Sequence, residues 1–195
     1  MVDDRSGGGM SPFSIPAPDR AEAIARVVPV FETERLRLRA PKMADYPAYE
    51  VVLGSARARY MDGPFTPEDA FNDFCQGVAG WMLRGTGMWT VTARDADAPL
   101  GWIFLWREFG DPEDEMGWIL TEAAEGQGFA LEAARAVLPH AVALYGPGGF
   151  VSYIHAENLA SARLAKALGA VRDPLAEAAL GDPMLYIYRH TGELQ

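Results

Sequence analysis

The chain has 195 residues, enough for one domain with a substantial core, and its 49% hydrophobic and 23% charged residues exclude a disordered protein. Seventeen Lys and Arg against 27 Asp and Glu give a formal charge of −10, which argues against a nucleic-acid partner and weakly favours a cationic substrate. Cys75 is the single cysteine, and the three histidines have no metal-ligand spacing, so we expect neither a disulfide nor a metal.

The N-terminal segment lacks the features of an export signal. Residues 1–11 contain Asp3, Asp4 and three glycines in place of a basic region followed by an apolar run. Nowhere do eighteen apolar residues follow one another, which predicts no membrane span. We therefore expect a cytoplasmic protein that does not bind membranes.

Hydrophobic periodicity predicts an arm over residues 1–30 and one domain over residues 31–195. The arm contains a short helix that ends before Pro29. Residues 31–40 alternate Leu and Arg, as in a half-buried strand. Helices are then expected over 45–52 and 67–83, the second with Thr66 as its N-cap.

Short aromatic and β-branched runs predict an antiparallel meander of strands over 88–94, 100–109 and 116–120. A long helix follows over 129–145, and Pro139 is expected to bend or break it. The predicted elements after it are a strand over 150–155, a helix over 158–168 that ends at Gly169, and a strand over 184–190. This order predicts an α/β fold with a mixed, mostly antiparallel sheet flanked by helices.

A glycine-containing turn leads from the third strand of the meander into the long helix, with the sequence EGQGFA over 125–130. Free N–H groups at a helix start bind anions, and glycines allow a close approach, so the turn indicates a phosphate-bearing cofactor. A P-loop is excluded because no Lys-Ser/Thr pair follows, and a dinucleotide fingerprint because Leu131 stands where it needs Gly or Ala. A simple tight turn at Gly126 and Gly128 remains the alternative.

Four segments in this order resemble the RimJ/RimL-like branch of the GNAT superfamily of N-acetyltransferases. They are TERLRLR (33–39), EMGWIL (115–120), EGQGFALEAA (125–134) and HAENLASARLAKALGA (155–170). The resemblance implies a single-domain GNAT fold in which the fourth and fifth strands, 115–120 and 150–155, splay apart in a V to admit the pantetheine arm. It implies acetyl-CoA as the acyl donor and an amine as the acceptor.

The resemblance also implies the site residues. Glu115 would be the catalytic base, acting through water, and Ser161 the acid that protonates the leaving sulfur. The expected cofactor-binding residues are Trp118, Leu120, Gly126, Gln127, Gly128, Phe129, Ala130 and Asn158. Glu125 departs from the family pattern, which has Gln or Arg there, and this predicts weaker attraction for the pyrophosphate unless the backbone amides suffice.

Structural roles for these residues stay open at this point. Glu115 is equally interpretable as a solvated member of the acidic loop over 111–115. Asn158 is a favoured helix N-cap, and Ser161 would then be a polar residue of the first turn.

The acceptor is expected to be a protein or peptide N-terminus, with a small-molecule amine as the alternative. Its selection is expected from the first two helices of the domain, 45–52 and 67–83, from their connection over 57–65, and from the segment 172–183. A non-catalytic acyl-CoA-binding module is a further alternative, and a homodimer is left open. A serine hydrolase is disfavoured because no Gly-x-Ser-x-Gly motif occurs.

Overall fold

The computed structural model describes residues 14–192, so most of the expected arm before residue 18 lies outside the described residues. The helices are α1 (Pro18–Ala25), α2 (Tyr46–Leu53), α3 (Pro67–Leu83), α4 (Phe129–Tyr145), α5 (Leu159–Ala167) and α6 (Pro174–Leu180), with short 3₁₀ turns η1 (Met43–Asp45), η2 (Ala56–Tyr60) and η3 (Glu122–Ala124). The strands are β1 (Phe31–Glu32), β2 (Leu36–Arg39), β3 (Met88–Ala93), β4 (Pro99–Trp106), β5 (Glu115–Leu120), β6 (Val151–His155), β7 (Ala170–Arg172) and β8 (Leu185–His190).

These strands form one sheet in the order β1-β2-β3-β4-β5-β6-β8-β7. Neighbouring strands are antiparallel except β5 and β6, which are parallel and share a single register pair, Glu115 with Val151. Every residue of β5 pairs with β4, so β5 keeps its place while β6 departs from it. The predicted fold is confirmed, including the V-shaped separation of these two strands.

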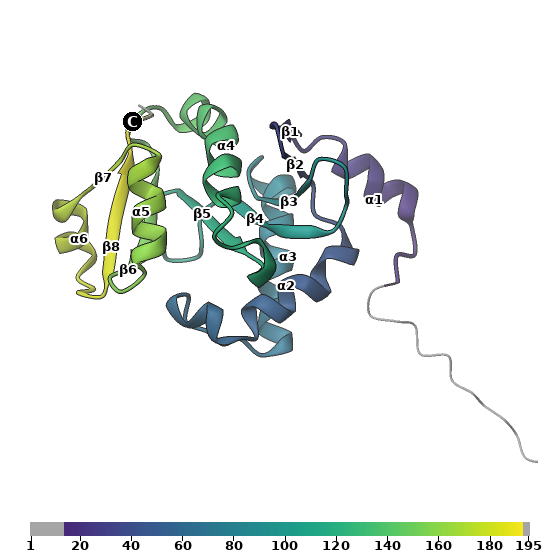
Figure 1. Cartoon of the computed structure of the whole chain (residues 1–195), viewed down its shortest axis with the longest axis horizontal. Coiled ribbons are helices and arrows are strands. Elements are labelled where there is room, and N and C mark those ends of the chain that lie inside the picture. The colour runs from purple at the N-terminus through teal and green to yellow at the C-terminus, as the bar shows by residue number, and fades with distance from the viewer. Residues whose placement is uncertain (1–13, 193–195) are drawn as a thin grey trace, which may run out of the picture.

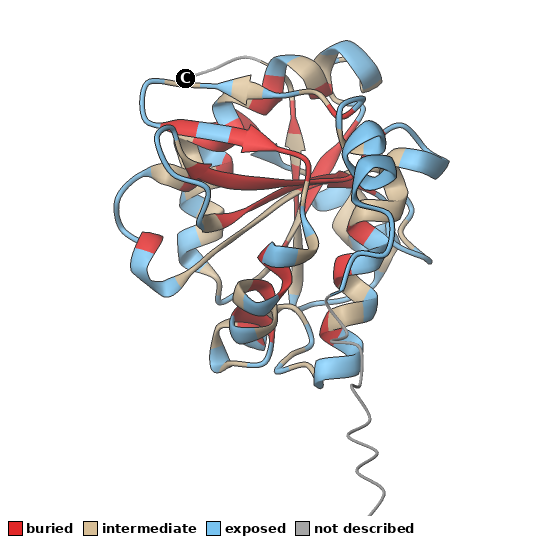
Figure 2. Cartoon of the chain, turned by 90° about the vertical axis from the view of Figure 1, so that its right-hand side faces the viewer, coloured by how far each residue is buried: buried red, intermediate tan, exposed pale blue. Residues whose placement is uncertain are grey.

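Alternating side chains of the central strands build two cores on opposite faces of the sheet. On β4, Ile103 and Leu105 pack under α4, while Trp102, Phe104 and Trp106 pack under α2 and α3. Figure 1 shows α4 and α5 on the near side of the sheet and α2 and α3 behind it. Buried residues are concentrated along the strands in the middle of the molecule (Figure 2).

Three segments differ in detail from the sequence-based predictions. The strand expected over 31–40 is a tight hairpin, because hydrogen bonds of the Thr33 amide and hydroxyl with Leu36 turn the chain between β1 and β2. The segment 172–183, for which no element was predicted, contains α6. Pro139, expected to bend or break α4, does not break it: the helix continues from Phe129 to Tyr145.

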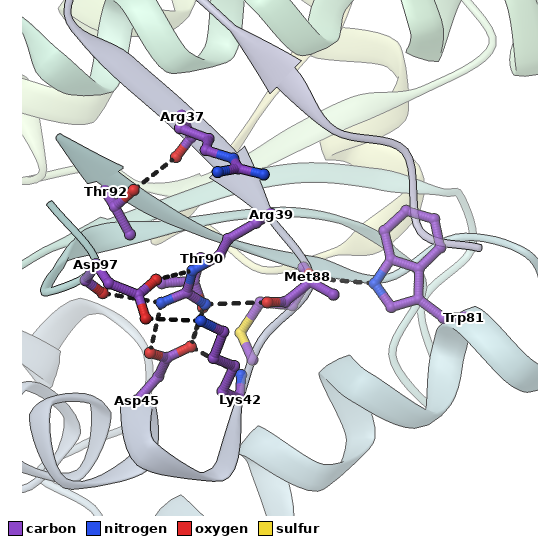
Figure 3. A network of polar contacts seen from close by, with 10 residues as sticks. Arg37, Arg39, Lys42, Asp45, Trp81, Met88, Thr90, Thr92 and Asp97 are labelled. Carbon is purple, nitrogen blue, oxygen red and sulfur yellow. Dashed lines mark hydrogen bonds and ion pairs between the residues drawn. The ribbon is translucent and has the colours of Figure 1, made fainter. Parts of the chain in front are cut away.

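A buried ionic network fixes η1 and α2 to the sheet (Figure 3). The Arg39 guanidinium of β2 bonds both carboxylate oxygens of Asp45, at 2.7 and 2.9 Å, and also Asp97 at 2.7 Å. Thr90 of β3 and the Lys42 amide donate to Asp45 as well. Only 9% of the Arg39 side chain and 3% of the Asp45 side chain are exposed. Each buried charge is therefore stabilised mainly by its ion pair with the other.

We expect Asp45→Ala to lower the free energy of unfolding by about 3 kcal/mol, because it leaves the buried Arg39 charge without its main partner. Asp97→Asn is the matched control, since the Asp97 side chain is 65% exposed and its loss leaves the Asp45 pair intact; it should cost about 1 kcal/mol or less. Urea denaturation measures both values. Equal losses in the two variants would contradict this account of the network.

Candidate active site

The gap between β5 and β6 opens where side chains replace the bonds of the strand ladder. Beside the Glu115–Val151 pair, the Val151 amide donates to the Asp114 carbonyl at 2.9 Å. The next two bonds come from side chains: the Tyr153 amide donates to the Glu115 carboxylate at 3.4 Å, and the Ser152 hydroxyl donates to the Met116 carbonyl. Beyond this point no pairing between the two described strands continues.

The glycine turn lies beside this gap and starts α4. Gly126 and Gly128 have φ values of 72° and 80°, which other residues rarely adopt, so the turn itself requires both glycines. Gly128 is the N-cap of α4, and the free N–H groups that follow it mark the positive end of the helix dipole. The turn is held by the Gln127 side chain, which donates to the Ala123 carbonyl at 2.6 Å, and by Arg35, which donates to the Gln127 carbonyl.

A cavity of about 710 Å³ runs along β5, the glycine turn and α5. It is lined by Trp118 and Leu120 of β5, by the turn and the start of α4, and by α5. Three arginines also line it: Arg57 and Arg59 of η2 and Arg163 of α5. Its shape and basic side chains suit a long anionic ligand. We call it the cofactor groove.

A second cavity of about 390 Å³ lies on the other side of β5, under α2, α3 and η2. Aromatic side chains form much of its wall, and Glu115 lies at its end toward the junction of β5 and β6. The carboxylates that line it are Asp62, Asp73, Glu108, Asp111 and Glu115. We call it the acceptor cavity.

The two cavities share a boundary formed by Trp118, Asn158 and Ser161, together with Tyr60 and Met61. The Trp118 indole N–H donates to the Ser161 hydroxyl at 3.1 Å, which orients that hydroxyl across the gap. The Asn158 side chain accepts a bond from the Ser161 amide at 3.1 Å, so Asn158 is the N-cap of α5. Asn158 thus has a structural role as the cap of α5, and it also lines both cavities.

Burial in the acceptor cavity changes the acidity of its carboxyl groups. Burial, and to a lesser extent the charges of Glu108 and Asp111, raise the pKa of Glu115 from 4.5 to about 8. The pKa of Glu108 rises to about 7 for the same reasons. A carboxyl group with a pKa near neutrality can both take and give a proton under working conditions.

Arg57 balances the negative charge of Glu125, the residue that stands where the GNAT pattern has Gln or Arg. Its guanidinium forms an ion pair with Glu125 and lies 3.7 Å from Glu122. Its Nε is buried and has no hydrogen-bond partner among the described residues. The groove therefore carries a cation beside position 125, although that cation comes from η2.

The structure brings most of the predicted site residues to these cavities. Those that line one or both are Glu115, Trp118, Leu120, Gly126, Gly128, Ala130, Asn158 and Ser161. Gln127 and Phe129 line neither: Gln127 bonds within the turn, and the Phe129 ring packs against Arg35. Of the segments expected to select the acceptor, the stretch from Tyr60 to Phe65 lines the acceptor cavity, whereas 172–183 contributes to neither cavity.

Comparison with known proteins agrees with this geometry. Residues 35–171 match the model of the acetyltransferase (GNAT) domain. The chain belongs to the GNAT acetyltransferase family. An N-acetyltransferase of Bacillus subtilis, YnaD, is 30% identical over 143 residues, covering 72% of this chain and 82% of YnaD.

Solved structures show the same fold. An acetyltransferase from Agrobacterium tumefaciens has a TM-score of 0.77 and 35% identity, covering 84% of this chain and 94% of that one. The RimL ribosomal L7/L12 α-N-protein acetyltransferase in complex with coenzyme A has a TM-score of 0.64 and 18% identity, covering 85% and 100%. The protein is thus a GNAT N-acetyltransferase, and this family uses acetyl-CoA. No helix within residues 14–192 of this acetyltransferase is long and apolar enough to cross a membrane.

The raised pKa of Glu115 predicts how the stability of the acetyltransferase depends on pH. The folded state favours the protonated carboxyl, so stability is full at low pH and falls as pH rises from about 4.5 to about 8. Glu115→Gln should therefore be more stable than the wild type by up to about 5 kcal/mol at pH 9 and nearly equal at pH 4. Denaturant melts at both pH values measure this. Exposed Glu34→Gln is the control; the same gain in both variants, or none in Glu115→Gln, would contradict the assignment.

Proposed function

We propose that this acetyltransferase moves the acetyl group of acetyl-CoA directly to a primary amine where the cofactor groove meets the acceptor cavity. The observation that carries the proposal is the shared boundary: Trp118, Asn158 and Ser161 face both cavities. A thioester lying along the groove would present its carbonyl at this boundary. An amine in the acceptor cavity would approach the same carbon from the other side.

Glu115 and Ser161 have suitable positions for the two proton transfers. Glu115 faces only the acceptor cavity, where it would draw a proton from the ammonium through water. The amine nitrogen then bonds to the thioester carbon, the carbon–sulfur bond breaks, and the sulfur takes the proton that Ser161 donates. The second proton that the nitrogen loses as the amide forms restores the Ser161 hydroxyl. Because Trp118 donates to the Ser161 oxygen, the hydroxyl hydrogen is free to point elsewhere. A backbone amide of β5 near Leu120 would stabilise the oxyanion.

The cofactor would be held mainly by backbone groups. The N–H groups from Gly126 to Ala130, Gln127 and Phe129 included, would bind the pyrophosphate at the start of α4. Trp118 and Leu120 would lie along the pantetheine arm, because their strand has no partner on the β6 side. Asn158 would hold that arm from the start of α5.

Two classes of acceptor are supported by different observations. A protein N-terminus is the acceptor of RimL, a ribosomal L7/L12 α-N-protein acetyltransferase with which this chain shares the fold. A small amine is supported by the acceptor cavity, whose volume of about 390 Å³ is at the lower end of small-molecule sites.

Acetyl transfer is tested by measuring free thiol released from acetyl-CoA with peptides and small amines. Binding is measured separately by a thermal melt, since acetyl-CoA at a hundred times its Kd should stabilise the protein by about 2.7 kcal/mol. We expect both signals. Stabilisation without thiol release in the presence of any amine would instead support a non-catalytic acyl-CoA-binding module.

Glu115→Gln and Ser161→Ala should each lower kcat by about a hundredfold, because each removes one proton transfer. Glu115→Gln retains an oxygen that can accept from the Tyr153 amide, so the strands should stay in place. Trp118→Phe is the control for Ser161→Ala: it removes the bond to Ser161 but keeps the hydroxyl. We expect it to lower kcat by less than Ser161→Ala does, because it misorients the hydroxyl without removing it. Unchanged kcat in both Glu115→Gln and Ser161→Ala would refute the two assignments.

Arg57 should contribute to CoA affinity from outside the glycine turn. Arg57→Gln should raise the Kd of CoA about tenfold, because the groove loses a cation and Glu125 loses its partner. Glu125→Gln should lower the Kd, because it removes an anion and frees Arg57. Isothermal titration with CoA, and with pantetheine as the ligand that lacks phosphates, measures both. Equal effects on the two ligands would show that Arg57 does not act on the phosphates.

A further inference from the structure

The acceptor cavity collects negative charge from separate parts of the chain. Asp62 follows η2, Asp73 lies on α3, Glu108 and Asp111 follow β4, and Glu115 begins β5. No lysine or arginine is among the described residues that line this cavity. The fold therefore brings five carboxylates, two of them exposed, to one cavity beside the proposed reaction centre.

None of these five carboxylates forms an ion pair with a described residue, whereas their neighbours in the same loop do. Glu113 pairs with Arg189 and Asp114 with Arg84. Burial raises the pKa of Asp111 and the charge of Arg107 lowers it, but the Arg107 guanidinium bonds the carbonyls of Asp111 and Pro112 and not a carboxylate. The acidic side chains of the cavity thus lack the cationic partners that the neighbouring acidic residues have.

The hydrogen bonds that these carboxylates accept come from uncharged donors. The Tyr49 hydroxyl donates to Asp73, the Glu108 amide to Asp111 and the Tyr153 amide to Glu115. Burial and the charges of Asp73, Asp111 and Asp62 raise the pKa of Glu108, and the charge of Glu108 raises the pKa of Glu115 in turn. Mutual repulsion is thus stored in the cavity, and a cation inside it would relieve that repulsion.

Among residues 14–192, no three Asp, Glu, His or Cys side chains converge closely enough to hold a metal. The carboxylates are instead spread along a cavity walled by aromatic rings, including Tyr60, Phe65, Phe104 and Trp106. Such a wall packs against methylene groups and attracts ammonium groups. The cavity therefore suits an extended aliphatic cation.

We propose that the acceptor is a small aliphatic diamine, with one amine placed for reaction beside Glu115 and Ser161 and a second ammonium held by Glu108, Asp111 and Asp73. This inference rests on the proposed function and adds the substrate class. One charge of the acceptor is lost on acetylation, while the second remains and anchors the substrate. Specificity then comes from the part of the acceptor that does not react.

The test is a series of amines of equal length that differ only in their far end: diaminobutane, aminobutanol and aminobutyrate, whose far ends are positive, neutral and negative. We expect kcat/KM to fall at least about tenfold at each step, because the first change removes the attraction between the second ammonium and the carboxylates and the second change replaces it with repulsion. Peptides with and without a lysine at the second position are measured alongside. Equal kcat/KM across the amine series, or a preference for peptides over diaminobutane, overturns the inference and leaves acetyl transfer intact.

Glu108→Gln locates the second ammonium. It should lower the ratio of kcat/KM for diaminobutane to that for aminobutanol by about tenfold. Asp95→Asn is the matched control, because Asp95 is exposed in a turn outside the cavity and its loss changes the net charge equally. An equal change of the ratio in both variants would show a long-range field instead of a site, and would overturn the assignment.

Binding is measured independently of turnover by titrating diaminobutane into the complex with CoA. Binding that Glu108→Gln weakens supports the cation site. Absence of binding to the wild type overturns the inference even if peptides are acetylated. Absence of acetylation for every amine and peptide, with diaminobutane still bound, means that the proposed function has failed while the cavity still selects a diamine.

Discussion

The separation of β5 from β6 is the feature on which the rest of the site depends. The two strands share one register pair, and the next hydrogen bonds are taken by the Glu115 carboxylate and the Ser152 hydroxyl. Side chains thus take over the hydrogen bonds of the Tyr153 amide and the Met116 carbonyl where the ladder ends. The strands can then diverge inside a continuous sheet, which opens a passage between two cavities and places Glu115 at its narrow end.

The two cavities joined by this passage carry side chains of opposite charge. The cofactor groove carries Arg57, Arg59 and Arg163 together with a helix start, whereas the acceptor cavity carries carboxylates and no basic side chain from the described residues. An anionic donor and a cationic acceptor would each be attracted to its own side. The turn η2 contributes to both cavities. Its Arg57 pairs with Glu125 in the cofactor groove, and its Tyr60 stacks on His155 of β6 beside the acceptor cavity.

The sequence predicted the fold and much of the site because the informative residues are local. The meander, the glycine turn and the Asn158 cap are each encoded within a few neighbouring positions. The acceptor cavity is different: Asp62, Asp73 and Glu108 meet only after three elements pack together, and nothing in their spacing signals it. Arg57 was missed for the same reason, because its partner Glu125 is far along the chain. The net charge was the single signal available for a cationic substrate.

The account is tested most directly by a crystal structure of the protein with CoA. It predicts that the pantetheine arm lies between β5 and β6, with the sulfur within hydrogen-bonding reach of the Ser161 hydroxyl and facing the acceptor cavity. The pyrophosphate should lie on the amides from Gly126 to Ala130, near Arg57. A cofactor bound outside the gap, or a sulfur directed away from the acceptor cavity, would contradict it.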